Sequence, residues 1–114
     1  MKFSTTLKKN HEFKRLYSKG KSAASPFFVI YCNKNRRTVN RIGITVSTKL
    51  GNAVQRNRIR RRLREIYRLN EDKLKAGFDI VIVARYKSKY AGFLELETDY
   101  LRICRRLGLC GGAD

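Results

Sequence analysis

Seven arginines lie between positions 56 and 68 of this chain, and the same segment holds a single acid, Glu65. Arginine binds phosphate through two parallel hydrogen bonds and also stacks on nucleobases, and lysine does both less well. A helix built only for stability would mix Glu and Lys to gain ion pairs four residues apart. The segment therefore indicates phosphate binding, with a merely solvated helix face as the alternative.

A helical wheel separates the arginines from a narrow stripe that must face the interior. The helix would begin near Arg56 and Arg58, where its dipole disfavours cations but its free backbone N–H groups attract phosphate. Positive charge is thus concentrated where a phosphate would bind. The stripe is Ile59, Leu63, Ile66 and Asn70, the outward positions are Asn57, Arg61, Arg64 and Arg68, and the flanks are Arg56 with Arg60 and Arg58 with Arg62.

Three aromatic residues, Phe13, Tyr17 and Tyr31, form a second candidate site. Phe13 and Tyr17 share one face of a predicted helix, and Tyr31 shares a predicted strand face with Phe27 and Val29. Single-stranded RNA is commonly held by bases that stack on such rings beside a basic groove. Packing in the core is the alternative role, and for Phe13 the sequence favours neither. The basic residues that could contact phosphates nearby are Lys14, Arg15 and Lys49.

The whole chain is strongly basic, because 27 Lys and Arg oppose nine Asp and Glu, for a formal net charge of +18. A compact domain with so much like charge repels itself, and a polyanion relieves that repulsion. Nucleic acid is the usual partner of such a protein. An anionic membrane surface is the weaker alternative.

The length of 114 residues fits one compact domain, and 42% apolar residues are enough for a core. We expect a single RNA-binding domain over residues 1–114, with flexible ends at 1–8 and 108–114. No apolar run approaches the roughly 20 residues of a membrane span, and the start of the chain lacks the apolar stretch of a signal peptide. The expected location is the cytoplasm, with no membrane partner and no obligate protein partner.

The sequence predicts neither catalytic nor metal-binding residues in the chain itself. A metal-dependent nuclease needs converging carboxylates, but only Glu95, Glu97 and Asp99 cluster, and their spacing spreads them around a helix. With His11 as the one histidine and no CxxC spacing, a zinc site of the usual four-ligand kind is not available. The thiols, which we expect to be reduced and partly in the core, are Cys32, Cys104 and Cys110.

Three helices are predicted from apolar spacing and from residues that start or stop helices. The first covers residues 10–19, with Asn10 as its N-cap and Gly20 just beyond it. The second, which carries the arginines, begins at residue 53 and ends between residues 68 and 75. The third covers residues 92–107, where apolar residues recur every three or four positions.

Strands are predicted over residues 27–32, 41–47 and 78–84, with a weaker signal for a short strand at 21–24. The first two would pair as a hairpin, since they are adjacent in sequence. The continuous apolar run at 78–84 suggests that helices cover both faces of the sheet. The order α-β-β-α-β-α therefore predicts an α/β sandwich, with one mixed sheet of three to four strands and helices packed on it.

The arginine segment resembles the signature of the bacterial ribonuclease P protein family. The matching residues are Gly51-Asn52-Ala53-Val54, one variable position, and then Arg56-Asn57-Arg58. The resemblance continues through residues 8–17, 27–31, 41–47 and 79–85, and covers roughly residues 3–107. Position 60 is often lysine in the family and Tyr17 is often phenylalanine, so the charge and the ring are retained here.

The resemblance implies a fold, a partner and a division of labour. The family's fold is an α/β sandwich like a domain of a small-subunit ribosomal protein, with an unusual left-handed βαβ crossover. The chain would be the protein subunit of an endoribonuclease that removes the 5′ leader from precursor tRNA. The catalytic groups and Mg²⁺ would belong to an RNA subunit, and the sequence does not reveal whether the protein itself binds a metal.

The resemblance also assigns roles to both candidate sites. The arginine face would bind the catalytic RNA subunit, and the aromatic residues would line a cleft for the precursor's leader. Arg62 is an additional charge without an assigned role. The RNA-subunit residues would be Arg56, Asn57, Arg58, Arg60, Arg61, Arg64 and Arg68, and the leader residues would be Phe13, Tyr17, Tyr31, Lys14, Arg15 and Lys49.

Two other functions remain open from the residues alone. A ribosomal or other structural RNA-binding protein, without a part in catalysis, would have a similar composition. A nuclease that works without RNA is the second, although it is disfavoured by the scattered acids.

Overall fold

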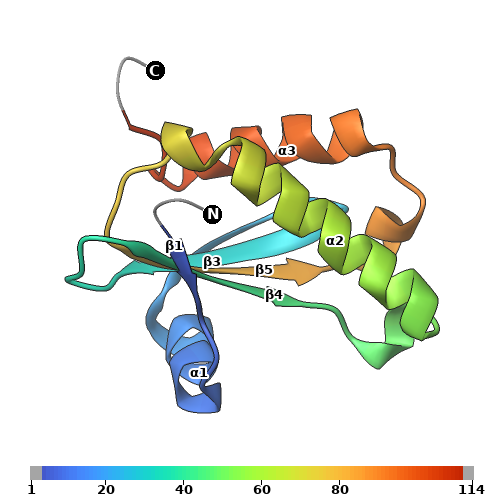
Figure 1. Ribbon diagram of the computed structural model, residues 1–114, viewed down its shortest axis with the longest axis horizontal. Helices are drawn as coiled ribbons and strands as arrows, with labels where there is room; N and C mark the ends of the chain where they lie inside the picture. The colour runs from blue at the N-terminus through green and yellow to red at the C-terminus, as the bar shows by residue number, and fades with distance from the viewer. Residues whose placement is uncertain (1–3, 112–114) are drawn as a thin grey trace.

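The computed structural model describes residues 4–111 as one sheet between two layers of helices (Figure 1). Helix α1 covers one face of the sheet, and α2 and α3 cover the other. The strands are β1 (Ser4–Thr6), β2 (Lys21–Ala24), β3 (Phe28–Lys34), β4 (Asn40–Thr45) and β5 (Phe78–Ala84). The helices are α1 (Asn10–Lys19), α2 (Ala53–Leu69) and α3 (Phe93–Arg106), with short 3-10 turns η1 (Thr48–Leu50), η2 (Glu71–Lys73) and η3 (Tyr86–Lys89).

The sheet has five strands in the order β1-β4-β5-β3-β2, so the predicted mixed α/β sandwich is confirmed with more strands than expected. The predicted hairpin of β3 with β4 is wrong, because β5 lies between them. β5 pairs antiparallel with β3 and parallel with β4. Its Ile80, Val81 and Ile82 are fully buried, and a strand that is apolar on both faces gains most at the centre of a sheet.

The connection from β4 through α2 to β5 joins two neighbouring parallel strands, and it is left-handed (Figure 1). Connections of this kind are right-handed in nearly all proteins, because strand twist favours that hand. The crossover places α2 over β4, so the arginine helix lies along the same edge of the sheet as β1.

The described residues near both ends of the chain contribute to the fold, and the flexibility expected of residues 1–8 and 108–114 stays a prediction. β1 pairs in parallel with β4, and Leu7 is buried beneath α1. Near the other end, Leu109 is fully buried, and the backbone of Cys110 forms an isolated antiparallel β-bridge with Leu74. Buried apolar side chains connect both segments to the rest of the fold. Residues 1–3 and 112–114 lie outside the described part.

Alternation along the strands divides the interior into two cores. Phe28, Ile30 and Cys32 of β3 face α2 and α3, where most of the buried side chains gather. A smaller core under α1 contains Leu7, Leu16 and Val81. Helix α1 begins one residue earlier than its predicted cap implies: Lys9 is the N-cap and its carbonyl accepts the first helical N–H groups, while Asn10 is already helical.

The start of α2 is fixed by a reciprocal cap that the sequence prediction missed. The Asn52 side chain accepts a hydrogen bond from the Gln55 backbone N–H at 2.9 Å, and the Gln55 side chain accepts from the Asn52 N–H at 3.0 Å. Gly51 precedes this cap with φ of 145°, a conformation that favours glycine, and a Cβ there would lie 2.2 Å from Gln55 Oε1. The Gly-Asn pair therefore sets where the arginine helix begins.

Candidate nucleic-acid interface

The outward face of α2 forms an open hollow of about 420 Å³ between its own side chains. Arg60 donates a hydrogen bond from Nη1 to Asn57 Oδ1 at 2.8 Å, which orients its guanidinium beside the hollow. On the inner side, the predicted stripe of Ile59, Leu63, Ile66 and Asn70 is buried as expected. The hollow is lined by one exposed valine, one asparagine and three arginines, namely Val54, Asn57, Arg60, Arg61 and Arg64.

The remaining arginines of α2 have different surroundings. Arg68 pairs with Glu65 on the exposed surface, so part of its charge is already neutralised. Arg58 is exposed on the flank, whereas Arg56 is half-buried. Within residues 4–111, the Nε of Arg56 is buried without a hydrogen-bond partner, and a bound acceptor would satisfy it.

Arg62, which had no assigned role, donates a hydrogen bond from Nη2 to the backbone carbonyl of Ala91. It therefore joins α2 to the segment that follows η3. Burial lowers the pKa of the Arg62 guanidinium, and the nearby positive charge of Arg58 lowers it further. The structure thus gives Arg62 an internal partner instead of an outward position.

The aromatic residues are brought together on the α1 face of the sheet, but not all in the same way. The rings of Tyr17 and Tyr31 meet edge to face with centroids 4.9 Å apart, and Tyr17 is 42% exposed. Phe13 lies deeper, against Leu7 and the small core. Phe27, expected beside Tyr31, instead packs against the larger core on the opposite face.

A small hollow of about 100 Å³ lies between the two candidate sites. Phe13 from α1 and Arg64 from α2 both line it, beside Gly43 and Ile44 of β4. Among the described residues, β1 pairs with β4 at Asn40–Ile42, so the edge of β4 is left open beyond Ile42. The arginine face and the aromatic side of the sheet are therefore contiguous around this edge.

The three basic residues predicted beside the rings are spread along the α1 face. Lys14 is exposed on α1, and Lys49 is exposed in η1, a few residues beyond Thr45 of β4. The Tyr17 hydroxyl lies 3.4 Å from the Thr45 hydroxyl, so Lys49 follows the strand end that Tyr17 contacts. Arg15 instead lines a polar hollow of about 440 Å³ with residues of the β3–β4 connection, including Arg36 and Arg37.

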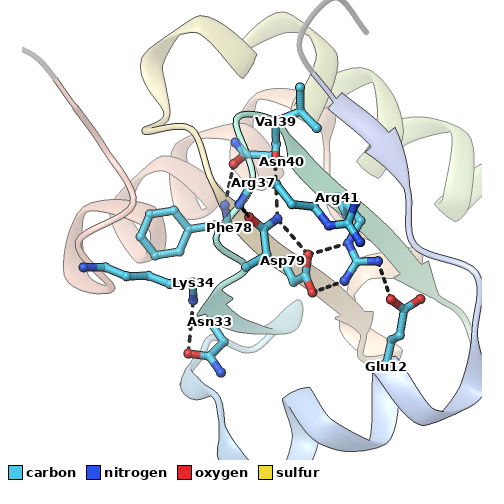
Figure 2. Close-up of polar contacts among 10 residues, drawn as sticks. Glu12, Asn33, Lys34, Arg37, Val39, Asn40, Arg41, Phe78 and Asp79 are labelled. Atoms are coloured by element: carbon cyan, nitrogen blue, oxygen red, sulfur yellow. Dashed lines mark hydrogen bonds and ion pairs between the residues drawn. The ribbon is translucent and has the colours of Figure 1, made fainter.

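A network around Arg41 fixes α1 to the sheet, and sequence reasoning missed it. Figure 2 shows Arg41 of β4 between Asp79 of β5 and Glu12 of α1. Arg41 donates from Nε and Nη2 to the two Asp79 oxygens, at 2.8 and 2.6 Å, and the Asn35 amide adds a donor at 2.9 Å. Two-point pairing of this kind is geometrically strict, so it orients the Arg41 guanidinium to which Glu12 of α1 binds.

Charge pairing dominates the titration of this network. Burial alone would raise the pKa of Asp79, but hydrogen bonds from Arg41 and Asn35 outweigh it and hold that pKa below its usual value. The hydrogen bond to Asp79 in turn raises the pKa of Arg41. Both partners therefore remain charged, and the polar hollow beside them keeps an excess of positive charge from Arg15, Lys34, Arg36 and Arg37.

Two of the three thiols lie in the core. Cys32 and Cys104 are buried, as expected, and burial raises the pKa of Cys104 to about 12. Within residues 4–111, no three His, Cys, Asp or Glu side chains are grouped so that they could hold a metal ion. In the same residues, no helix is long and apolar enough to cross a bilayer.

An arginine-lined helix beside exposed aromatic rings, on a strongly basic sandwich, defines a nucleic-acid-binding α/β protein. The chain belongs to the ribonuclease P protein family, whose sequence profile, described as Ribonuclease P, matches residues 1–108. Ribonuclease P protein components from Alkaliphilus metalliredigens and Clostridioides difficile are 43% and 44% identical, each over 109 residues. The alignments cover 96% and 93% of this chain and 98% and 96% of those proteins.

Solved structures agree with this assignment. The ribonuclease P protein of Staphylococcus aureus superposes with a TM-score of 0.85 at 34% identity, covering 93% of this chain and 97% of that one. The Thermotoga maritima protein gives 0.81 at 32% identity, with 89% and 96% covered. The family resemblance inferred from the arginine segment is thereby confirmed, and the ribosomal alternative is not favoured.

Proposed function

We propose that this chain, as the protein subunit of ribonuclease P, binds the catalytic RNA subunit through the outward face of α2. The observation that carries the proposal is the hollow where Asn57, Arg60, Arg61 and Arg64 converge at the surface. Guanidinium groups arranged in this way suit successive phosphates of one RNA strand. The full set of contact residues proposed on this face is Arg56, Asn57, Arg58, Arg60, Arg61, Arg64 and Arg68.

The precursor's 5′ leader would lie on the α1 face of the sheet. Tyr17 and Tyr31 offer stacking surfaces there, because their paired rings are partly exposed. Phe13 would act from below by supporting the cleft floor as well as by contact, since it lies at the edge of the small core. The phosphate contacts proposed along this path are Lys14, Arg15 and Lys49, all of which are exposed.

Cleavage itself would be carried out by the RNA subunit, with Mg²⁺ held by RNA and the protein positioning the substrate. Several of the acidic side chains already have other partners. Two carboxylates hold Arg41, two more hold arginines on their own helices, and one accepts from a buried amide. Glu12 and Asp79 pair with Arg41. Glu65 pairs with Arg68 and Asp99 with Arg102, and Glu97 accepts a hydrogen bond from the Asn70 amide.

Cleavage of a precursor tRNA tests the proposal when protein alone, RNA subunit alone, and both together are compared at low Mg²⁺. We expect fast, accurate removal of the leader only with both, because the protein strengthens substrate binding that Mg²⁺ alone supports poorly. Cleavage by the protein alone would overturn the division of labour. An Arg61→Ala variant that supports cleavage like the unchanged protein, at protein concentrations limiting for assembly, would overturn the role of the α2 face.

A further inference from the structure

Two tyrosines outside both candidate sites are conspicuously exposed in the turn after β5. Tyr86 and Tyr90 have 55% and 69% of their surface exposed. Their rings meet with centroids 5.5 Å apart at an interplanar angle of 62°, and their hydroxyls lie 2.9 Å apart. The Lys89 ammonium lies 5.5 and 5.9 Å from the two ring centres. An aromatic pair with a cation beside it is thus displayed to solvent.

The turn that carries this pair is firmly held. Ser88 is fully buried and donates a hydrogen bond from its hydroxyl to the Arg85 carbonyl at 2.7 Å. Arg85 in turn donates from Nη1 to the Ser25 carbonyl at 3.0 Å. The exposure of the rings is therefore not a consequence of a loose loop, and a ligand would meet a surface that is already ordered.

The turn is also attached to the arginine helix. Arg62 donates to the Ala91 carbonyl, directly after Tyr90, and α2 packs against η3. Arg58 lies close enough to Arg62 to lower the pKa of that guanidinium. In Figure 1 the turn that follows β5 lies beside the N-terminal half of α2. The tyrosine pair therefore continues the flank of α2 that carries Arg58.

We infer that the Tyr86–Lys89–Tyr90 turn binds an unpaired nucleobase of the RNA that lies along α2. Aromatic rings stack on any base, and a neighbouring ammonium pairs with the phosphate of the same nucleotide. An interior role does not account for rings that are more than half exposed, and the surrounding charges favour an anionic strand. This inference rests on the proposed function, because the strand must already lie on the arginine face.

Binding of a single-stranded RNA of ten adenosines to the full chain, followed by fluorescence anisotropy over a range of salt concentrations, tests the inference. We expect the double variant Tyr86→Ala/Tyr90→Ala to bind roughly tenfold more weakly, which lies within the usual effect of removing one stacked base. The salt dependence should keep its slope, because no charge is removed. Tyr86→Phe/Tyr90→Phe, which keeps both rings, and Leu94→Ala, an exposed apolar control on α3, should bind like the unchanged chain.

Three results would overturn the inference. The first is unchanged affinity of the alanine variant, and the second is an equal loss in the phenylalanine variant, which would implicate the hydroxyls alone. The third is a large fall in melting temperature for both the double variant and Tyr90→Ala alone, which would assign the rings to folding. Arg61→Ala is the separate control: if it too leaves RNA affinity unchanged, the proposed function fails and not only this inference.

Two further measurements identify the source of the base. Affinity for the RNA subunit, and the difference in affinity between leader-bearing precursor and mature tRNA in the assembled complex, are compared for the alanine and phenylalanine variants. A loss in the first measurement assigns the base to the RNA subunit, and a loss only in the second assigns it to the leader. Either loss supports the site, whereas no loss in either contradicts a role in the complex.

Discussion

The ring of Phe13 occupies the space above Gly43 that a side chain at position 43 of β4 would otherwise fill. A Cβ at Gly43 would lie 2.7 Å from two ring carbons of Phe13. Helix α1 is consequently able to approach the sheet at this point, and Tyr17, one turn further on, reaches Tyr31 and Thr45. The glycine therefore contributes to the position of Tyr17 beside Tyr31.

Gly43→Ala should destabilise the fold by about 1 to 3 kcal/mol, because the added methyl group overpacks a filled space. Denaturant unfolding measures this loss. Combining it with Phe13→Leu, a smaller side chain at the contact, should give less than the sum of the two single losses. Strict additivity would show that the two residues do not compete for the same space.

Tyr17→Ala should weaken binding of a leader-bearing precursor by roughly 1 to 3 kcal/mol, the usual effect of one stacked base. Affinity for mature tRNA, which lacks the leader, should hardly change. Tyr17→Phe is the matched control, since it keeps the ring. Equal losses for precursor and mature tRNA, or a lower melting temperature without a selective loss, would favour a packing role for Tyr17.

Arg58→Ala and Arg61→Ala should each weaken assembly with the RNA subunit and lower the salt slope by roughly 0.7 to 0.9 for each phosphate that the variant no longer neutralises. Arg102→Ala removes an arginine of α3 that is likewise exposed and lies far along the chain from the proposed interface, and it serves as the control. A slope that is unchanged in the α2 variants would mean that these arginines are only solvated charge.

Asp79→Asn should lower the free energy of unfolding by about 1 to 3 kcal/mol at neutral pH, because Arg41 is deprived of a charged two-point partner. The pKa of Asp79 in the folded protein lies below its ordinary value of 3.8. The stabilisation is therefore complete above that value and is lost as the pH falls through the folded pKa. Denaturant unfolding below about pH 4 should show the two proteins converging; a constant difference would contradict this account.

Cys32 and Cys104 should resist alkylation in the folded protein at mildly alkaline pH, because burial raises the pKa of both thiols and the thiolate is the reactive form. Half-buried Cys110 should react first. Mass spectrometry of the labelled chain distinguishes the three sites, and denaturant should make all three reactive. Labelling of Cys104 as fast as Cys110 in the native state would show that the region beneath α3 opens readily.

The helices could be predicted closely from sequence because their signals are local. The stripe from Ile59 to Asn70 fixes which face of α2 is buried, and the structure agrees. Strand order could not be obtained in this way, because adjacency in sequence favoured a hairpin of β3 with β4. The apolar run at 78–84 already indicated a strand covered on both faces, but that pattern does not say between which neighbours it lies.

Side-chain partners were the other limit of prediction. A helical wheel gives the direction of Arg62 but cannot show the Ala91 carbonyl, which comes from a segment 29 residues away. The Arg41 network joins residues 12, 41 and 79, so no local pattern indicates it. By contrast, the cap of α2 was readable from Asn52 and Gln55, three positions apart, and the spacing of Tyr86 and Tyr90 was equally visible in the sequence.

The central position of β5 determines when the protein can fold as it is synthesised. β3 and β4 can complete their pairing only with this strand, which is the last of the five to leave the ribosome. Until residue 84 has emerged, the nascent chain exposes an arginine helix and two strands whose inner edges are unpaired. Unpaired strand edges can associate with other chains. Because pairing between strands far apart in sequence forms slowly, these edges stay exposed for longer. The chain is therefore most prone to association before the last strand closes the sheet.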